Sequence, residues 1–241
     1  MSEENKELET SQETAQAAEA EKTTKRKNEK KESVNIGKEI WEWIYTIAIA
    51  VIIAFLIKNF LFDIVRVDGS SMYPTLVDND RLIVTKLGYE PKHGDIIILD
   101  STYKKREAYY DKLAAQEGKD ELSTFDKLLN NRKLPSECKK VYYVKRVIAL
   151  PGQTVDLGDD GRVYVDGVAV DEPYANGETR SIDSTVQYPV TVEDGMVFVM
   201  GDNRMHSKDS RSSDLGQVPQ DAILGKSQVR VWPFNSISLT R

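Results

Sequence analysis

The chain has 241 residues, of which 30% are charged, and its formal net charge is -6. This acidic balance argues against nucleic acid as the main partner, so we expect no nucleic-acid binding. The single cysteine excludes an internal disulfide, and no cluster of His, Cys and Asp has metal-ligand spacing, so we predict neither a metal nor another cofactor.

The N-terminal part is predicted to be a disordered tail followed by a membrane span. Residues 1–38 are rich in Glu, Lys, Thr and Gln and hold almost no large apolar side chains, so they cannot bury enough surface to fold. Residues 41–62 are mainly apolar, with charged side chains only near the two ends. As a helix they would be roughly 33 Å long, which matches a hydrocarbon core of about 30 Å. We therefore predict one transmembrane helix over residues 39–63.

The charges around this segment predict its orientation. Seven Lys and Arg lie between Lys22 and Lys38, and few follow the span. The positive-inside rule then keeps the tail in the cytoplasm and places residues 64–241 outside, in a single-pass protein of the cell membrane. A cleaved signal peptide is the alternative, but it would have small residues at its exit, where this chain has Phe60, Leu61 and Phe62.

The exported part reads as an all-β domain built from many short antiparallel strands. Apolar and β-branched residues alternate or gather in runs bounded by Gly, Pro and Asp, which is typical of strands. Asp166-Gly167 is predicted to form a tight type I′ hairpin. The strands are expected at residues 64–68, 81–86, 95–99, 140–150, 154–157, 162–165, 168–170, 195–200 and 227–232.

Residues 101–140 interrupt the strands. Lys, Glu, Ala, Gln and Leu dominate there, and these residues favour helix. Ser123 and Asp126 have the spacing of a capping box, so we predict a mostly helical insertion that ends before Pro135. The insertion carries no catalytic signature, and Cys138 within it is expected to be a bystander.

Two residues together suggest a hydrolytic pair. Ser71 follows Gly69 and Ser70, which would leave its hydroxyl exposed and its backbone N–H free to bind an oxyanion. Lys145 lies in an apolar strand next to Arg146, and burial would lower the pKa of its amine toward neutrality. A neutral amine can take the serine proton and return it to a leaving amine. The alternatives are a serine in an ordinary turn and an edge-strand lysine that reaches water.

A third polar cluster completes a resemblance. It follows a predicted strand and is rich in hydrogen-bonding side chains. A Ser-Met-Tyr-Pro-Thr-Leu run and a strand that contains Lys-Arg come before this cluster. The order of these three motifs after an N-terminal span resembles the order in bacterial type I signal peptidases. The motifs that carry this resemblance are residues 71–76, 143–146, 150–152 and 201–211.

The resemblance implies a membrane-bound serine endopeptidase that removes signal peptides from exported preproteins after a small-x-small sequence. It makes Ser71 the nucleophile and Lys145 the general base. Ser207 would orient Lys145, and Asp209 with Arg211 would form a supporting salt bridge. The implied partners are signal peptides, the lipid bilayer through residues 41–62, and the secretion translocon as a further candidate.

The resemblance also implies that the substrate adds as an extended strand beside the segments before Ser71 and Lys145. Shallow apolar pockets there would accept Ala and reject long side chains. Their expected lining is Val65, Val67, Met72, Leu76 and Val144.

Two features differ from what relatives would show. Some members carry a hydroxyl two residues before the nucleophile, where this chain has Gly69, so the oxyanion would depend on the Ser71 N–H, with Ser70 as the other candidate. The insertion over residues 101–140 is not expected of compact relatives.

Three other classes of protein compete with this interpretation. A Ser-His-Asp hydrolase would need His93 or His206, the only histidines. A membrane-anchored adaptor without activity would lack one of the two catalytic residues, and both Ser71 and Lys145 are present. Self-cleaving Ser/Lys repressor proteases carry a DNA-binding domain, where this chain has the predicted span.

Overall fold

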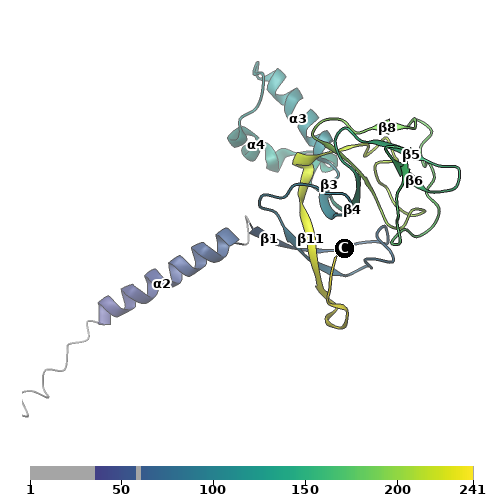
Figure 1. Ribbon diagram of the computed structural model, residues 1–241. Coiled ribbons are helices and arrows are strands. Elements are labelled where there is room, and N and C mark those ends of the chain that lie inside the picture. The colour runs from purple at the N-terminus through teal and green to yellow at the C-terminus, as the bar shows by residue number, and fades with distance from the viewer. Residues whose placement is uncertain (1–35, 58–60, 241) are drawn as a thin grey trace, which may run out of the picture. The chain divides into compact units, whose positions relative to one another are not determined.

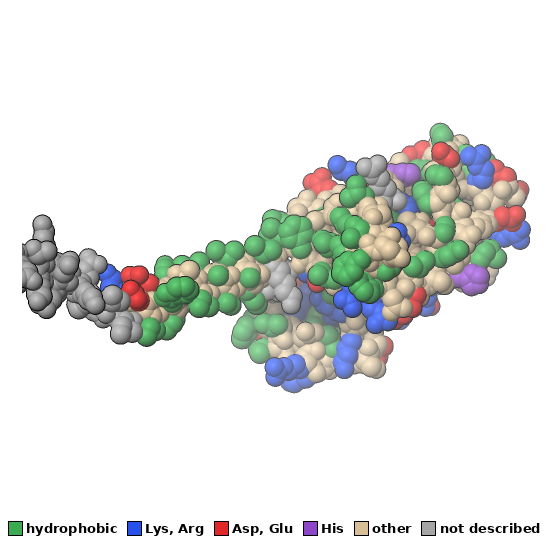
Figure 2. Space-filling model, turned by 90° about the horizontal axis from the view of Figure 1, so that it is seen from below, with side chains coloured by type: hydrophobic (Ala, Val, Ile, Leu, Met, Phe, Trp, Pro, Cys, Tyr) green, Lys and Arg blue, Asp and Glu red, His purple; other side chains and the backbone are tan. Residues whose placement is uncertain are grey.

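The computed structural model describes residues 36–57 and 61–240, which fall into two units that divide between Phe55 and Leu56. In the first unit, helix α2 (Ile36–Leu56) covers most of the predicted span, and Figure 2 shows the apolar side chains along it. Within the described ranges, no helix is both long enough and apolar enough to cross a membrane. Residues 1–35 of the predicted tail lie outside the described residues, as do residues 58–60 of the predicted span. Residues 36–38 are helical, although the sequence assigns them to the disordered tail.

The second unit contains two sheets in which every strand pair is antiparallel (Figure 1). The large sheet has the order β1-β2-β11-β3-β4-β9-β10, with β12 paired to β11, and the small sheet has the order β7-β6-β5-β8. The strands are β1 (Phe62–Arg66), β2 (Arg81–Thr85), β3 (Ile96–Asp100), β4 (Tyr142–Ala149), β5 (Thr154–Leu157), β6 (Val163–Val165), β7 (Val168–Ala169), β8 (Val190–Thr191), β9 (Met196–Met200), β10 (Val218–Pro219), β11 (Ile223–Trp232) and β12 (Ser238–Leu239). The antiparallel, β-rich architecture is the one the sequence predicts.

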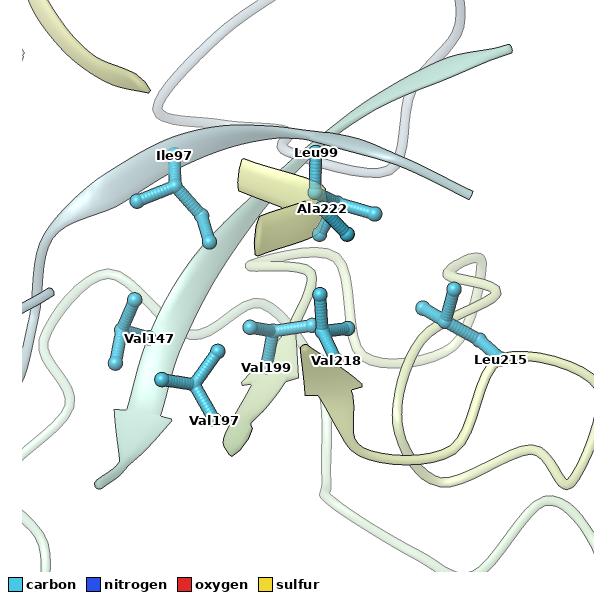
Figure 3. Close-up of a cluster of buried hydrophobic side chains, with 8 residues drawn as sticks. All are labelled: Ile97, Leu99, Val147, Val197, Val199, Leu215, Val218 and Ala222. Carbon is cyan, nitrogen blue, oxygen red and sulfur yellow. The ribbon is translucent and has the colours of Figure 1, made fainter. Parts of the chain in front are cut away.

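Strand β3 is buried along its whole length because both faces of the large sheet are covered. Ile97 and Leu99 pack on one face with Val147 of β4 and Val199 of β9 (Figure 3). Ile96 and Ile98 point to the opposite face. There they join a second cluster that contains Val67, Met72, Leu76, Leu82 and Val84. The chain that follows β1 is therefore held against the sheet by its own apolar side chains.

The small sheet contains the expected tight hairpin. Asp166 and Gly167 both have positive φ, at 52° and 77°, as a type I′ turn requires. The turn joins β6 to β7, and Val155, Val163 and Val165 pack with Phe198 and Met200 of the large sheet. The two sheets therefore share a core.

The insertion between β3 and β4 is helical, as predicted (Figure 1). It contains α3 (Tyr103–Gln116), α4 (Thr124–Asn130), η2 (Asn131–Lys133) and η3 (Ser136–Cys138); η4 (Gln220–Ala222) and η5 (Phe234–Ser236) lie later in the chain. The side chain of Ser123 caps α4 and Asp126 reciprocates, so the predicted capping box is present. Tyr110, Ala114, Leu122, Leu134 and Cys138 give the insertion a small core of its own. Phe125 is 65% exposed, so the apolar face of α4 is not part of that core.

Candidate active site

Ser71 lies in a compact turn that follows β1. The N–H of Tyr73 donates to the Ser70 carbonyl over 3.1 Å, and that of Leu76 donates to the Met72 carbonyl over 2.9 Å. The side chains of Met72 and Leu76 are each 1% exposed and anchor the turn in the core. The anchored turn leaves the Ser71 hydroxyl at the surface of a groove.

Gly69 provides the bend that turns the chain toward Ser71. Its φ is +99°, in the region that favours glycine, and its N–H donates to Asp78 Oδ1 over 3.0 Å. Among the described residues, no acceptor takes the N–H of Ser71. This N–H is therefore available to an incoming oxygen.

Lys145 comes from β4, in register with Ile97 of β3, and is 3% exposed. Its Nζ lies 2.8 Å from Ser71 Oγ and 2.9 Å from the carbonyl oxygen of Val144. The ring of Tyr143 lies 5.2 Å from the same nitrogen. Burial lowers the pKa of Lys145 to about 8, although the negative charges of Asp209 and Asp202 oppose the shift. The amine is thus close to the hydroxyl and easier to deprotonate than an ordinary lysine.

The loop after β9 holds the Ser71 turn from behind. The N–H of Asn203 donates to the Ser71 carbonyl over 3.0 Å, and Asn203 Nδ2 donates to the Ser70 carbonyl over 3.0 Å. Gly201 packs so closely that a Cβ there would lie 2.4 Å from the Ser71 carbonyl oxygen and 2.2 Å from Ser207 Oγ. Only glycine fits at this position, because the site has no space for a side chain.

The expected ion pair between Asp209 and Arg211 is present and fully buried. Arg211 donates from Nε to Asp209 Oδ1 and from Nη2 to Oδ2, both over 2.9 Å. Burial acts to raise the pKa of Asp209, but the hydrogen bonds and charge of Arg211 outweigh it and hold this pKa below its usual value. The N–H of Gly201 also donates to this carboxylate over 3.0 Å, so the pair fixes the loop.

Ser207 lies in the site but does not make the hydrogen bond expected of it. Its hydroxyl is buried and acts on the Asp209 carboxylate, whose pKa it helps to lower, and no hydrogen bond joins it to Lys145 in the described part of the chain. Lys145 donates instead to Ser71 and to the backbone of Val144. Ser207 packs against Gly201, as the close Cβ approach shows.

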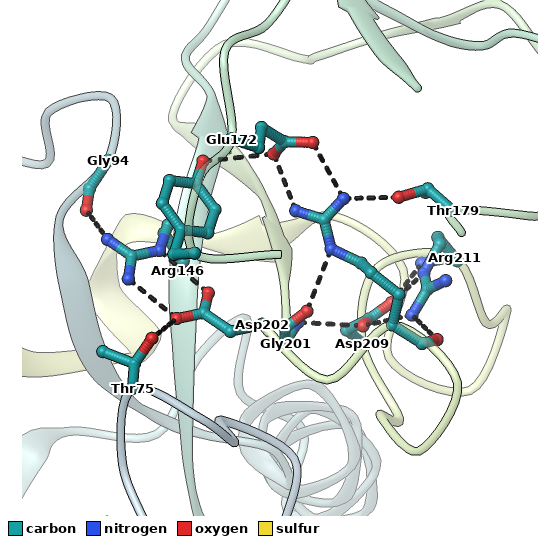
Figure 4. A network of polar contacts seen from close by, with 11 residues as sticks. Thr75, Gly94, Arg146, Glu172, Thr179, Gly201, Asp202, Asp209 and Arg211 are labelled. Carbon is teal, nitrogen blue, oxygen red and sulfur yellow. Dashed lines mark hydrogen bonds and ion pairs between the residues drawn. The ribbon is translucent and has the colours of Figure 1, made fainter. Parts of the chain in front are cut away.

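A second ion pair was missed in the sequence. Arg146 donates to both carboxylate oxygens of Asp202, over 2.8 and 2.7 Å, and to the Gly94 carbonyl over 2.7 Å (Figure 4). The hydroxyl of Thr75 donates to Asp202 Oδ2 over 2.5 Å. Asp202 therefore ties β4 to the Ser71 turn. The sequence gives only one indication of this ion pair: Lys145 and Arg146 are adjacent cations in an apolar strand, and such cations cannot both stay unpaired.

A groove of about 400 Å³ runs past Ser71 and Lys145. Its lining includes Val65, Val67 and Val144, which were expected to contact substrate, and also Tyr142 and His206. Met72 and Leu76 do not line it; they lie in the core beneath, because the turn uses them as its anchors.

Among the described strands, none pairs with the edge of β4 that borders the groove. Strand β4 pairs with β3 from Tyr142 to Arg146, but β9 joins its other edge only from Arg146 onward. The outer edge of residues 142–145 is thus open for another strand.

Comparison with known proteins gives consistent matches. The family described as "Signal peptidase, peptidase S26" matches residues 40–232. Signal peptidase I T of Bacillus subtilis (strain 168) is 38% identical over 209 residues, which cover 83% of this chain and 89% of that protein. Signal peptidase IB of Staphylococcus aureus (strain COL) is 31% identical over 215 residues, covering 82% of this chain and 92% of that protein.

A solved structure, the signal peptidase I of Enterococcus faecalis V583, is 27% identical and covers 57% of this chain and 97% of its own, with a TM-score of 0.37. The assignment rests on the sequence matches, which extend over most of the chain and nearly the whole length of the relatives. The chain therefore belongs to the peptidase S26 family of signal peptidases, serine endopeptidases that remove signal peptides from preproteins.

Proposed function

We propose that Ser71 and Lys145 are the catalytic pair of this signal peptidase, with Ser71 as the nucleophile and Lys145 as the general base. The distance of 2.8 Å between Lys145 Nζ and Ser71 Oγ is the observation that carries the proposal. A buried lysine beside a partly exposed serine, at the wall of a groove, is the arrangement that nucleophilic catalysis needs.

Acylation would begin when the neutral Lys145 amine accepts the proton of the Ser71 hydroxyl. Oγ bonds to the scissile carbonyl carbon, and the N–H of Ser71 donates to the oxyanion that forms. When the C–N bond breaks, the Lys145 ammonium returns its proton to the leaving amine, which departs as the N-terminus of the mature protein. The signal peptide is then held as an ester on Ser71.

Deacylation would use the same groups. Lys145, again neutral, accepts a proton from a water molecule whose oxygen bonds to the ester carbon. The ammonium then protonates Oγ as the ester bond breaks, so that Ser71 is regenerated and the signal peptide leaves with a carboxyl group. Asp209 and Arg211 support the site by fixing the loop behind it.

The groove supports cleavage after small residues. A substrate strand beside the open edge of residues 142–145 would turn alternate side chains toward Val65, Val67 and Val144. These partly or fully buried side chains would leave only shallow hollows beneath the substrate strand, which would accept alanine and reject longer side chains. We therefore infer the small-x-small preference.

The predicted span, which must end before β1 begins at Phe62, would place this chemistry at the outer surface of the cell membrane. The mainly apolar run from Trp43 to Ile57 and the seven Lys and Arg of residues 22–38 that precede it in the sequence are what support this placement. The basic tail would remain in the cytoplasm, and residues 64–241 would form the extracytoplasmic domain. We also propose the secretion translocon as a partner, because it delivers the substrates.

The experiment is cleavage of a preprotein by the purified full-length chain in detergent. Ser71→Ala and Lys145→Ala should each reduce the rate by at least about a thousandfold, because each change removes a group that takes part in bond making. His206→Ala is the matched control from the groove and should keep most of the rate. Equal processing by the wild type and both alanine variants would eliminate the Ser71–Lys145 pair.

A further inference from the structure

A segment outside all the predicted motifs contacts the three arginines buried behind the catalytic pair. We name residues 172–180, which follow β7, the bracing segment. The Tyr174 ring lies 3.8 Å from the Arg146 guanidinium, Glu172 pairs with Arg204, and the Arg180 carbonyl accepts a hydrogen bond of 3.2 Å from Arg211. Buried guanidinium groups need such partners, because an unpaired charge in the interior is costly.

The pair between Glu172 and Arg204 is the strongest of these contacts. Arg204 Nη2 donates to Glu172 Oε1 over 2.7 Å, and Nη1 donates to Oε2 over 2.9 Å (Figure 4). The two side chains are 7% and 1% exposed. Thr179 accepts a third bond from Arg204 over 2.5 Å, and Tyr174 donates to Glu172 over 3.1 Å. A guanidinium held on both edges has no freedom to reorient.

A fourth donor of Arg204 reaches the catalytic side. Its Nε donates to the Gly201 carbonyl over 3.1 Å. Gly201 is the residue packed against the Ser71 carbonyl and Ser207, so this bond fixes the contact behind the nucleophile.

The backbone of the bracing segment binds the same loop. The N–H of Asn176 donates to the Asp202 carbonyl over 2.7 Å, and the N–H of Arg204 donates to the Asn176 carbonyl over 3.0 Å. Asn203, between them, donates to the carbonyl oxygens of Ser70 and Ser71. A continuous set of hydrogen bonds therefore leads from Glu172 to the nucleophile.

We propose that Glu172 is a positioning residue for peptide-bond cleavage: through Arg204 it fixes the Gly201–Arg204 loop and hence the placement of Ser71. The proposal rests on the proposed function of Ser71. Glu172 does not line the groove, so it acts on the chemical step and not on substrate binding. A displacement of about 1 Å in a reacting group can cost roughly a hundredfold in rate.

The first test is Glu172→Gln in the full-length protein, which keeps the shape and removes the charge. We expect kcat on a preprotein to fall roughly tenfold to a hundredfold while KM stays within about twofold. Glu172→Asp keeps the charge and should recover part of the loss. Glu178→Gln is the matched control, because Glu178 pairs with an arginine in the same segment but is 63% exposed; its kcat should not change.

The second test separates positioning from stability. Glu172→Met alone leaves the Arg204 charge buried without its partner, whereas the double variant Glu172→Met with Arg204→Met removes both charges and should regain thermal stability. Its kcat should stay low, because nothing then holds the Gly201 carbonyl.

Recovery of kcat together with stability in the double variant would overturn the proposal, as would a wild-type kcat for Glu172→Gln. The proposed function would fail differently: Ser71→Ala would then retain activity.

Discussion

Lys145 illustrates how the environment of one side chain decides its chemistry. An exposed lysine is protonated at neutral pH and cannot act as a base. Here burial in β4 brings the pKa to about 8, while Asp209 and Asp202 limit the shift. The result is an amine that is partly neutral at physiological pH and keeps a hydrogen bond to Ser71.

This pKa predicts the pH dependence of cleavage. Because the base must be neutral, kcat/KM for a substrate without ionisable groups near the cut should rise with pH and level off above about 8, leaving about one-tenth of the maximum at pH 7. The profile should be unchanged in His206→Ala, the histidine in the groove. A value of kcat/KM that rises only near pH 10, or a pH dependence that disappears in His206→Ala, would show that Lys145 is not the base.

The proposed catalytic pair could be found in the sequence, whereas most of the residues that support it could not. A lysine in an apolar strand is unusual enough to mark Lys145, and Ser71 follows a glycine turn. The sequence does not distinguish Asp202 and Glu172, because carboxylates in polar segments are common. Only the fold shows which arginine each of them pairs with. The sequence predicts that Met72 and Leu76 contact substrate, whereas in the structure both lie in the core and anchor the turn.

The alternation of apolar residues in the sequence predicts where the strands lie, but it does not predict all of their ends. Strand β1 begins at Phe62, before the predicted start, and β11 begins at Ile223, four residues early. In β11, Gly225 interrupts the apolar pattern, yet glycine is required there because a Cβ would lie 2.1 Å from the Thr85 carbonyl oxygen. The register with β3 also shifts between Ile223 and Gly225. The insertion was recognised because the capping box is a local signal.

The loop after β9 should tolerate no side chain at Gly201. Gly201→Ala would push against the Ser71 carbonyl and Ser207, so we expect a loss of about 1–3 kcal/mol in the free energy of unfolding and roughly a hundredfold loss of kcat. Denaturant unfolding and preprotein cleavage would measure the two effects.

Gly195→Ala is the comparison for this variant. Gly195 has a φ of +72° and open space around it, so the change should cost about 1 kcal/mol of stability and leave kcat intact. Similar kinetics for the two alanine variants would rule out the steric explanation.

The molecule as a whole is divided into an N-terminal unit and a folded catalytic unit. If the predicted span anchors the enzyme, the bilayer holds enzyme and precursor in one plane and raises their effective concentration. The chemistry itself belongs to the catalytic unit, whose strand β1 begins at Phe62.

A fragment that starts at residue 61 keeps all of β1 and should separate these two contributions. We expect it to cleave a short soluble peptide at the rate of the full chain, but to process a precursor embedded in vesicles at least about tenfold more slowly. Undiminished processing of the embedded precursor would contradict anchoring as a source of efficiency. A start at residue 65 would be a poorer choice, because it removes the pairing of Phe62 with Thr85.

The burial of Cys138 has a practical consequence. It is the only thiol in the chain, it is 5% exposed, and its sulfur lies 3.6 Å from the Lys105 carbonyl in the core of the insertion. A maleimide reagent can reach it only when that small core opens. The rate of thiol labelling therefore reports the opening of residues 101–140 separately from the unfolding of the sheets, without any engineered probe.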